Sequence, residues 1–125
     1  MKLKQIQNVM KKYGQAWEKR DTNLILDCFT EGGKYQESPL RKPYYGHKEI
    51  KNFWDKVVVK DTANIKFALG KCWVSEDGKT GFAEWTCRNI YKNKKNLMAG
   101  IMILKMKGDK ITYLNEYWNQ DNWLK

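Results

Sequence analysis

The spacing of apolar residues changes once along this chain, from a helical period to a strand period, and this change limits the possible folds more than any other feature. Near the N-terminus, apolar residues recur at steps of three and four, at Leu3, Ile6, Met10, Tyr13 and Trp17. Such steps put them on one stripe of a helix, expected over about residues 2 to 20. From Asn64 onward apolar and polar residues alternate instead, as in strands with one buried face. The order of the two patterns predicts an α+β fold.

Two shorter helices are expected between the first helix and the alternating region. Asp21 and Thr22 are good N-cap residues for the first of them, and Gly32-Gly33 supplies a left-handed stop. The other begins near Gly46-His47 and keeps helical spacing until the β-branched run of residues 57–59. The chain is therefore expected to place three helices before its sheet.

The strands are predicted from the alternation and from the turn residues between them. A short early strand covers Tyr35–Ser38 and is ended by Pro39, which has no backbone N–H to donate. Four antiparallel strands then follow as a meander with tight turns, at residues 64–73, 82–91, 97–107 and 111–118. We predict one domain over residues 1–125, with three N-terminal helices and a short early strand packed against an antiparallel sheet.

The strand faces follow from the two-residue period of a strand. In residues 82–91 the set that contains Ala83, Trp85 and Cys87 is predicted to be buried. Residues 97–107 are apolar on both parities, so the second face of that strand also needs a cover. A homodimer through the sheet face is the simplest cover.

The charge of the chain is strongly positive, with 24 Lys and Arg against 14 Asp and Glu, a formal net charge of +10. Three of those cations are arginines, Arg20, Arg41 and Arg88, and the rest are lysines. Base edges and phosphates are recognised best by the bidentate guanidinium group, so nucleic-acid binding is not favoured. The lysines of residues 92–95 and 105–110 gather at turns, which indicates either a solvated rim or a collar that attracts an anionic ligand such as a carboxylate or a phosphate.

The cysteine and histidine content argues against a metal or cofactor. Cys28, Cys72 and Cys87 are odd in number and show no ligand spacing, so no disulfide framework, metal site or cofactor is expected. His47 is the single histidine and is expected to cap a helix or face solvent. No apolar run is long enough to span a membrane or to form a signal peptide, so we expect a cytoplasmic protein.

Several short motifs occur in an order that resembles the SnoaL-like branch of the NTF2-like superfamily. They are Tyr13 to Asp21, Phe29-Thr30-Glu31, Tyr35 to Pro39, Gly46 to Ile50 with Phe53-Trp54, Gly108 to Ile111, and Glu116-Tyr117-Trp118. The resemblance implies a strongly curved antiparallel sheet that wraps around the helices as a cone, with a ligand pocket at its open end. It also implies a protein of the cyclase, isomerase or dehydratase type, or one that only binds or dimerises.

The resemblance also suggests which side chains meet in that pocket. Tyr35 and Glu37 would face the cavity from the first strand. The other expected lining residues are Tyr13, Trp17, Phe53, Trp54, Trp85, Cys87, Met102, Tyr117 and Asn119. Where epoxide hydrolases of this superfamily have an Asp-Arg-Asp trio, this chain has Cys87, Trp85 and Asn119. Where ketosteroid isomerase has an aspartate it has Ser38, and the late-strand acid of the cyclases has no clear equivalent.

Glu37 is the carboxylate that we predict as a general base, with Tyr35 as a hydrogen-bond donor. An acid that is desolvated among aromatic rings has a raised pKa, which suits base catalysis near neutral pH. A structural ion pair at the rim is the alternative for Glu37, and Glu84 and Glu116 are the alternative acids. Cys87 is expected to pack rather than react. The sequence leaves two functions open, acid–base catalysis on a small hydrophobic molecule, neutral or anionic, and non-catalytic binding.

Overall fold

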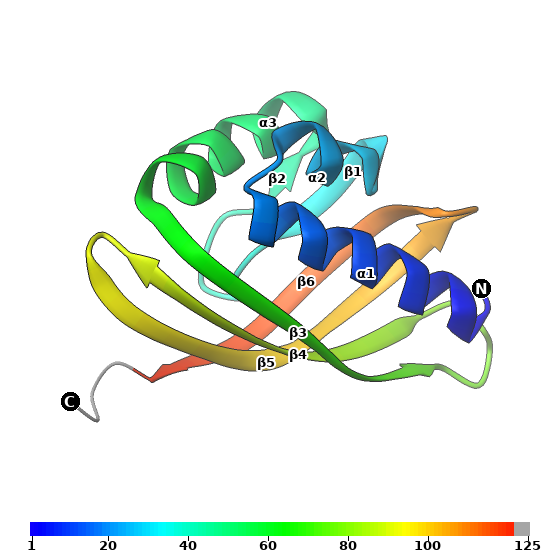
Figure 1. The fold of residues 1–125 in the computed structure, drawn as a ribbon. Helices are drawn as coiled ribbons and strands as arrows, with labels where there is room; N and C mark the ends of the chain where they lie inside the picture. The colour runs from blue at the N-terminus through cyan, green and yellow to red at the C-terminus, as the bar shows by residue number, and fades with distance from the viewer. Residues whose placement is uncertain (122–125) are drawn as a thin grey trace.

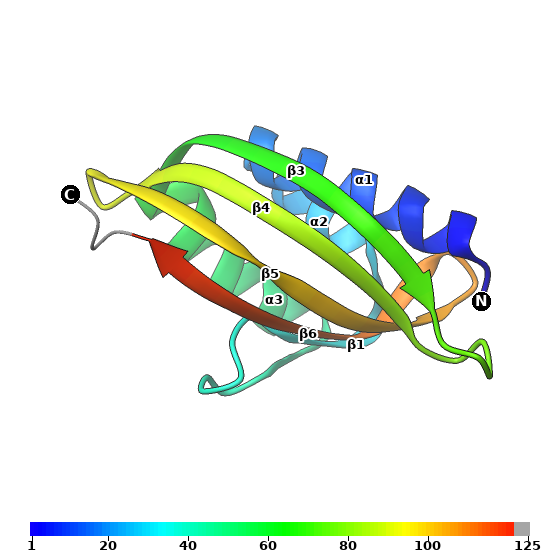
Figure 2. The same cartoon turned by 90° about the horizontal axis from the view of Figure 1, so that it is seen from below.

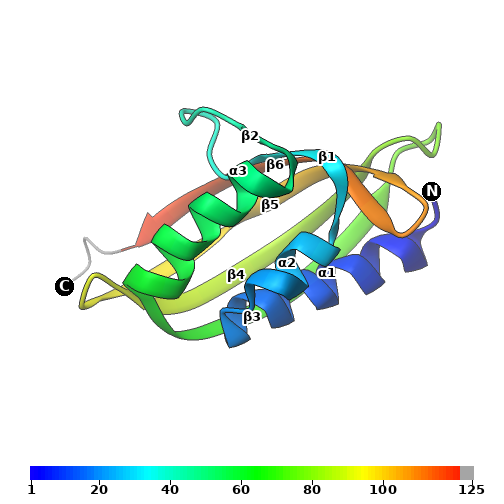
Figure 3. The same ribbon diagram turned by 90° about the horizontal axis from the view of Figure 1, so that it is seen from above.

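The computed structural model describes residues 1–121 and places three helices on one face of a six-stranded sheet (Figure 1). The helices are α1 Leu3–Lys19, α2 Thr22–Asp27 and α3 Gly46–Phe53, and a π-helical segment η1 at Trp54–Val59 continues α3. The strands are β1 Phe29–Gln36, β2 Tyr44–Tyr45, β3 Thr62–Val74, β4 Gly81–Tyr91, β5 Lys94–Lys107 and β6 Lys110–Asp121. Figure 3 looks down on the helices, and Figure 2 shows the opposite sheet face, which none of these helices covers.

Helix α1 forms where the apolar stripe predicted it, and the prediction is confirmed. Ile6, Met10 and Tyr13 on that stripe are fully buried against the sheet. The helix ends at Arg20, whose φ of 50° is left-handed, and α2 begins directly after it. The Asp21 carboxylate accepts a hydrogen bond from Leu24 N at 3.0 Å, which confirms the predicted N-cap. The short connection holds the two helices as neighbours.

The prediction for the early strand was wrong in its bounds. Gly32-Gly33 does not stop a helix, because α2 already ends at Asp27 and both glycines lie within β1. Here β1 passes close to β6, and a Cβ on Gly33 would lie 3.0 Å from the carbonyl oxygen of Ile111. The strand also ends at Gln36, so Glu37 follows the strand instead of lying in it.

The sheet is mixed, which corrects the prediction of an antiparallel sheet. Its order is β2-β1-β6-β5-β4-β3, and the meander from β3 to β6 is antiparallel as predicted. Strand β1, however, pairs with β6 in parallel, with Tyr35 opposite Leu114 and Gln36 opposite Asn115. The connection between these parallel strands contains α3 and the other strands, and local periodicity carries no signal of such a pairing.

The core lies between the helices and the inner face of the sheet. On β4 the predicted set is confirmed, since Ala83, Trp85, Cys87 and Asn89 are all buried. The largest fully buried side chains include Trp54, which η1 turns inward. Burying an aromatic or aliphatic side chain of this kind stabilises the fold by about 1.5–3 kcal/mol. Among residues 1–121, no helix combines the length and hydrophobicity that crossing a membrane requires.

Candidate active site

A buried carboxyl group on β6 lies at the centre of the site. The Glu116 side chain is only 3% exposed, although glutamate is among the residues that are rarely buried. The Tyr13 hydroxyl donates a hydrogen bond to Glu116 Oε2. The Tyr35 hydroxyl lies 3.0 Å from the Tyr13 hydroxyl and makes a longer contact of 3.5 Å with the same Oε2. We call Tyr13, Tyr35 and Glu116 the buried acid cluster.

Each member of the buried acid cluster comes from a different element. Tyr13 belongs to the apolar stripe that α1 lays on the sheet. Tyr35 is the inward residue near the end of β1, directly opposite Leu114 in the parallel pair. Two residues beyond Leu114, Glu116 has the same parity on β6 and therefore points to the same side. The parallel pairing of β1 with β6 thus brings the cluster together.

The surroundings of Glu116 keep its carboxyl group neutral at pH 7. Burial, with a smaller contribution from the nearby charge of Glu37, raises the pKa of Glu116 to about 8, although the hydrogen bonds from the two tyrosines oppose the shift. Burial also raises the pKa of Tyr13 and of Tyr35 well above the ordinary value, so both phenols keep their protons. Both tyrosines contact Oε2, which leaves Oε1 to carry the acidic proton.

A cavity of about 150 Å³ opens beside the buried acid cluster. Glu116, Glu37 and Arg41 contribute its charged and acidic groups. The rest of its wall is formed by Trp17, Phe53, Val57, Thr62, Asn89, Tyr91, Asn96, Met98, Trp118 and Gln120. A cavity of about 150 Å³ is the size that accommodates one benzene ring. The space therefore fits a small molecule with one apolar ring or a short chain.

Glu37 enters this cavity from the segment that follows β1. Its side chain is 13% exposed and lies 3.5 Å from the Nε of Arg41. Burial raises the pKa of Glu37, while the positive charge of Arg41 lowers it. The indole Nε1 of Trp118 donates a hydrogen bond to the Glu37 carbonyl oxygen and so ties this segment to β6.

The structure brings some of the predicted site residues to the cavity and leaves others in the core. Glu37, Trp17 and Phe53 line it. A much smaller void of about 10 Å³ next to it is lined by Tyr13, Trp17, Phe67, Trp85, Cys87, Met98 and Glu116. Tyr35, Trp54 and Met102 are fully buried.

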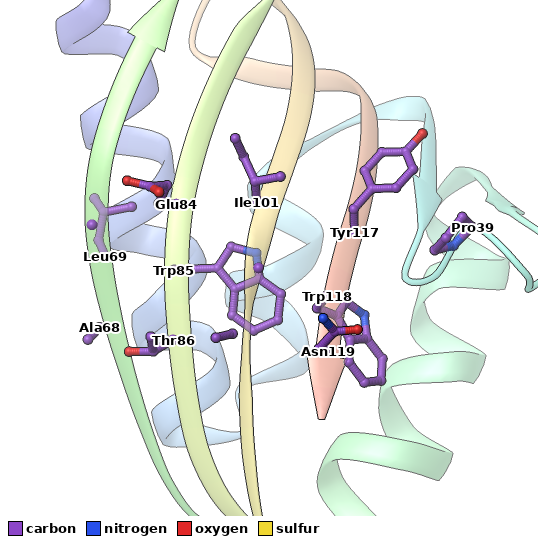
Figure 4. A pocket seen from close by; sticks show the side chains of 13 residues that line it. Pro39, Ala68, Leu69, Glu84, Trp85, Thr86, Ile101, Tyr117, Trp118 and Asn119 are labelled. Atoms are coloured by element: carbon purple, nitrogen blue, oxygen red, sulfur yellow. The ribbon is translucent and has the colours of Figure 1, made fainter. Parts of the chain in front are cut away.

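Tyr117 and Asn119 lie on the opposite face of the sheet, because beyond Leu114 the even-numbered residues of β6 point to the helices and the odd-numbered ones point away. There they line a shallow, open hollow of about 890 Å³ (Figure 4). Tyr117 is 39% exposed, and Glu84, Thr86 and Ile101 lie around the same hollow. These two predicted pocket residues therefore belong to the outer face and not to the interior cavity.

Glu116 is the residue that sequence reasoning ranked too low, as an alternative acid. A signal for it was present, because Leu114, Glu116 and Trp118 share one parity on a strand whose inner positions are apolar. A carboxyl group between two apolar residues of that parity is forced into the core together with them.

The remaining candidates have structural explanations. Burial raises the pKa of the Cys87 thiol to about 11, so it is not a thiolate at neutral pH. The Asn89 side chain also donates a hydrogen bond to its sulfur, at 3.5 Å. His47 lies at the start of α3, with Nε2 at 3.1 Å from the Phe29 carbonyl oxygen. Within the described part of the chain, no three His, Cys, Asp or Glu side chains gather as a metal site would require.

Comparison with known proteins gives a family and a fold. The model of the SnoaL-like domain matches residues 10–114. A solved structure from Bacillus subtilis, proposed to be an isomerase, superposes with a TM-score of 0.82 at 18% identity and covers 95% of this chain and 90% of that one. None of the curated proteins matches the sequence significantly.

Two further solved structures share the fold at lower identity. SalBIII, described as an epoxide hydrolase/cyclase-like enzyme in pyran ring formation, has a TM-score of 0.77 and 13% identity, covering 90% of this chain and 89% of that one. An LEH-like epoxide hydrolase of M. tuberculosis has a TM-score of 0.74 and 10% identity, covering 90% and 80%. At these identities the comparison shows the architecture and not the reaction.

Proposed function

The chain belongs to the SnoaL-like family, and from this premise we propose that it is an enzyme of the isomerase or cyclase type that moves protons within a small, mostly apolar substrate. One observation carries the proposal. Two carboxyl groups, Glu37 and Glu116, line the same cavity, and burial raises the pKa of both, to about 8 for Glu116, while the charge of Arg41 opposes the shift at Glu37 alone. Glu37 has a positive partner, whereas Glu116 has only neutral donors. This difference in partners assigns Glu37 as the base and Glu116 as the acid. Ketosteroid isomerase likewise uses two acids in opposite roles, one as the base and one as a protonated hydrogen-bond donor.

The proposed mechanism uses each carboxyl group in the form that its surroundings favour. Glu37, ionised, removes a proton from the carbon next to a substrate carbonyl. Glu116, neutral, donates a hydrogen bond from Oε1 to the oxygen on which negative charge develops. Glu37 then returns its proton to another carbon of the substrate. In a cyclisation the new carbon nucleophile instead adds to a second carbonyl carbon of the same molecule, and Glu37 returns its proton to the oxygen of that carbonyl. The proton count balances, since Glu37 gains and loses one proton and Glu116 keeps its own.

Tyr13 and Tyr35 act in this scheme through Glu116. Their hydroxyl groups hold Oε2, so the acid presents one orientation to the cavity. They are therefore positioning residues, and Tyr35 donates to Glu116 rather than directly to the substrate. Trp17 and Phe53 supply flat apolar walls for the substrate ring.

The names of the structural neighbours support the class of reaction. One is proposed to be an isomerase and another is described as cyclase-like. Epoxide hydrolysis is less suited to this chain, because the positions that resemble the trio of that chemistry hold Cys87, Trp85 and Asn119. Isomerisation or cyclisation is the reaction class that agrees with the acids present.

Non-catalytic binding is the second candidate function, and the buried acid cluster itself favours it. A neutral acid whose oxygen is held by two phenols is also a satisfied polar network of the kind that only stabilises a fold. In that case the cavity would bind its ligand without turnover. A homodimer through the outer sheet face is proposed with either function, because Leu97, Ile101 and Ile103 of β5 line that face without a helix over them. A solution mass of twice 14.9 kDa would support it.

Exchange of substrate protons with heavy water tests the catalytic proposal. Small ketones with one ring, such as cyclohex-2-enone, are incubated with the protein in D₂O, and loss of the α-proton signal is followed by NMR. Wild-type protein is expected to accelerate exchange, and Glu37→Gln to slow it by about 100-fold or more, since a positioned base contributes about 10²–10⁴-fold. Glu84→Gln on the outer face is the matched control and should leave the rate unchanged. Equal rates in wild-type protein and Glu37→Gln would leave binding as the function.

A further inference from the structure

Arg41 is the one cationic side chain on the wall of the cavity in the part of the chain that the structure describes. It lies in the loop between β1 and β2, and its side chain is 69% exposed. Its partner Glu37 is 13% exposed. The ion pair therefore reaches from the mouth of the cavity to its interior, with the guanidinium group at the mouth.

The loop backbone is fixed around Arg41. The Gln36 side-chain Nε2 donates a hydrogen bond to the Arg41 carbonyl oxygen at 2.8 Å. The Arg41 backbone N donates to the Ser38 carbonyl oxygen at 3.1 Å. With Trp118 bound to the Glu37 carbonyl oxygen as well, the loop is tied to the sheet on both sides of this ion pair. The loop backbone that carries Arg41 is thus held at the mouth of the cavity.

The guanidinium group has donors to spare. A guanidinium has five N–H donors, and the contact to Glu37 uses Nε alone, at 3.5 Å. That distance exceeds the 2.7–2.9 Å usual for hydrogen bonds between charged groups. Within residues 1–121 neither terminal nitrogen of Arg41 has an ion-pair or hydrogen-bond partner. These two nitrogens are free to bind a planar oxyanion side by side.

The presence of arginine and not lysine at position 41 points to a specific ligand, because most cationic residues of this chain are lysines. Three of its 24 cationic residues are arginines, and one of the three stands at the cavity mouth. Lysine offers a point charge, whereas arginine offers the flat fork that fits a carboxylate. The net charge of +10 attracts small anions toward the protein. Inside the cavity Glu116 is neutral and does not repel an anion.

We propose that the substrate is a small monocarboxylic acid with about one ring, and that Arg41 binds its carboxylate at the mouth of the cavity. The inference rests on the proposed function for the identity of the site. The ring lies inward between Trp17 and Phe53, and the carboxylate binds the two terminal nitrogens of Arg41 and draws the guanidinium group away from Glu37. An ion pair whose arginine is mostly exposed is weak, so the exchange is easy. Glu37 is then released from its counter-ion when the substrate binds, which makes it a stronger base.

Benzoate and benzamide test the proposal, because they have the same ring and nearly the same shape and differ in charge. Binding to the full chain is measured by calorimetry at pH 7. We expect wild-type protein to bind benzoate about tenfold more tightly than benzamide, in line with a charged hydrogen bond. Arg41→Gln should remove that preference and leave benzamide affinity within about twofold, and Arg41→Lys should restore part of it.

Arg88→Gln is the matched control, since Arg88 is exposed on the outer side of β4 and its loss changes the net charge equally. It should leave benzoate binding unchanged. The proposal is overturned if benzamide binds as tightly as benzoate, if Arg88→Gln weakens benzoate as much as Arg41→Gln does, or if neither molecule binds. Equal loss of both ligands in Arg41→Gln would also overturn it, because Arg41 would then shape the loop and not read the charge.

The experiments distinguish failure of the anion site at Arg41 from failure of the proposed catalysis. A preference for benzoate that depends on Arg41, without any proton exchange in ketones or keto acids, would retain the anion site and reject the catalysis. Proton exchange in neutral ketones, without any preference for benzoate over benzamide, would retain the catalysis and reject the anion site.

Discussion

Tyr13 on α1 and Glu116 on β6 are 103 residues apart in the sequence, and the phenol donates a hydrogen bond to the buried carboxyl group. The contact joins the first helix to the last strand at the place where the cavity opens. It also couples folding to protonation, because the buried Glu116 carboxyl group is held in its neutral form.

Stability is expected to fall as the pH rises from about 5 to about 8. The pKa of Glu116 is raised from an ordinary value of 4.5 to about 8 in the folded protein. Between these values the folded state holds a proton that the unfolded state has lost, so the free energy of unfolding decreases with pH. At 1.36 kcal/mol per pKa unit, the loss between pH 5 and pH 8 is on the order of 3–4 kcal/mol.

Urea unfolding at pH 5 and pH 8 measures this loss. Glu116→Gln should show a much smaller difference between the two pH values, because its side chain does not titrate. Glu84→Gln, which keeps Glu116, should behave as the wild type. A wild-type protein equally stable at both pH values would mean that Glu116 is ionised when folded.

Removal of the Tyr13 hydroxyl should raise the pKa of Glu116 further. The hydrogen bond from Tyr13 lowers that pKa, so Tyr13→Phe moves it above about 8. The protein should also lose about 1–3 kcal/mol of stability, the usual cost of a buried group left without its partner. The titration is followed by ¹³C NMR of the side-chain carboxyl carbon.

Tyr35→Phe is the matched variant for the same measurement. Its contact with Glu116 is long, at 3.5 Å, so the shift in pKa should have the same sign and be smaller. A larger effect from Tyr35→Phe than from Tyr13→Phe would contradict the geometry of the buried acid cluster.

The elements that local periodicity encodes were predictable from the sequence. The stripe of α1, the start of α3 at Gly46 and the meander of β3 to β6 each follow from the spacing of neighbouring residues. The bounds and pairing of strand β1 were not predictable, because its partner β6 lies about 80 residues away and a parallel pair leaves no turn signal between its strands. The glycines of β1 resembled a helix stop for the same reason.

The site was predictable where a residue's position depends on one helix or on the segment next to one strand. Glu37, Trp17 and Phe53 were chosen from the sequence and line the cavity. The partnership of Tyr13 with Glu116 requires knowing that these side chains of α1 and β6 meet in the core, and no local pattern contains that information. Tyr117 and Asn119 were wrongly predicted to line the cavity, since a shift of one residue along a strand decides which face a side chain occupies.

The Trp118 indole is expected to hold Glu37 in place for catalysis. Backbone pairing between β1 and β6 ends at Gln36 and Asn115, so the indole bond to the Glu37 carbonyl oxygen continues the connection beyond it. Trp118→Phe should keep the fold and slow ketone proton exchange about tenfold or more, because a misplaced base loses rate steeply. Tyr117→Phe, on the other face of the same strand, should leave the rate unchanged. A rate in Trp118→Phe equal to that of the wild type would show that the carbonyl anchor is dispensable.

Gly100 marks a point in β5 that admits no side chain. A Cβ at this position would lie 2.1 Å from the Tyr117 carbonyl oxygen and 2.6 Å from the Trp118 Cβ, both in the neighbouring strand β6. Because backbone is involved, strands β5 and β6 must separate locally to admit a methyl group. Gly100→Ala is therefore expected to destabilise the protein by about 2 kcal/mol or more, as overpacking does.

Gly32→Ala is the control for this effect, since nothing lies within 4 Å of the corresponding Cβ. That variant should be as stable as the wild type or slightly more stable, because alanine reduces the conformational freedom of the unfolded chain. Thermal and urea unfolding of the two variants provide the comparison. Equal stability of Gly100→Ala and Gly32→Ala would mean that β5 and β6 are not in the close contact described. It would also weaken the placement of Glu116 and Trp118, which depends on that pairing.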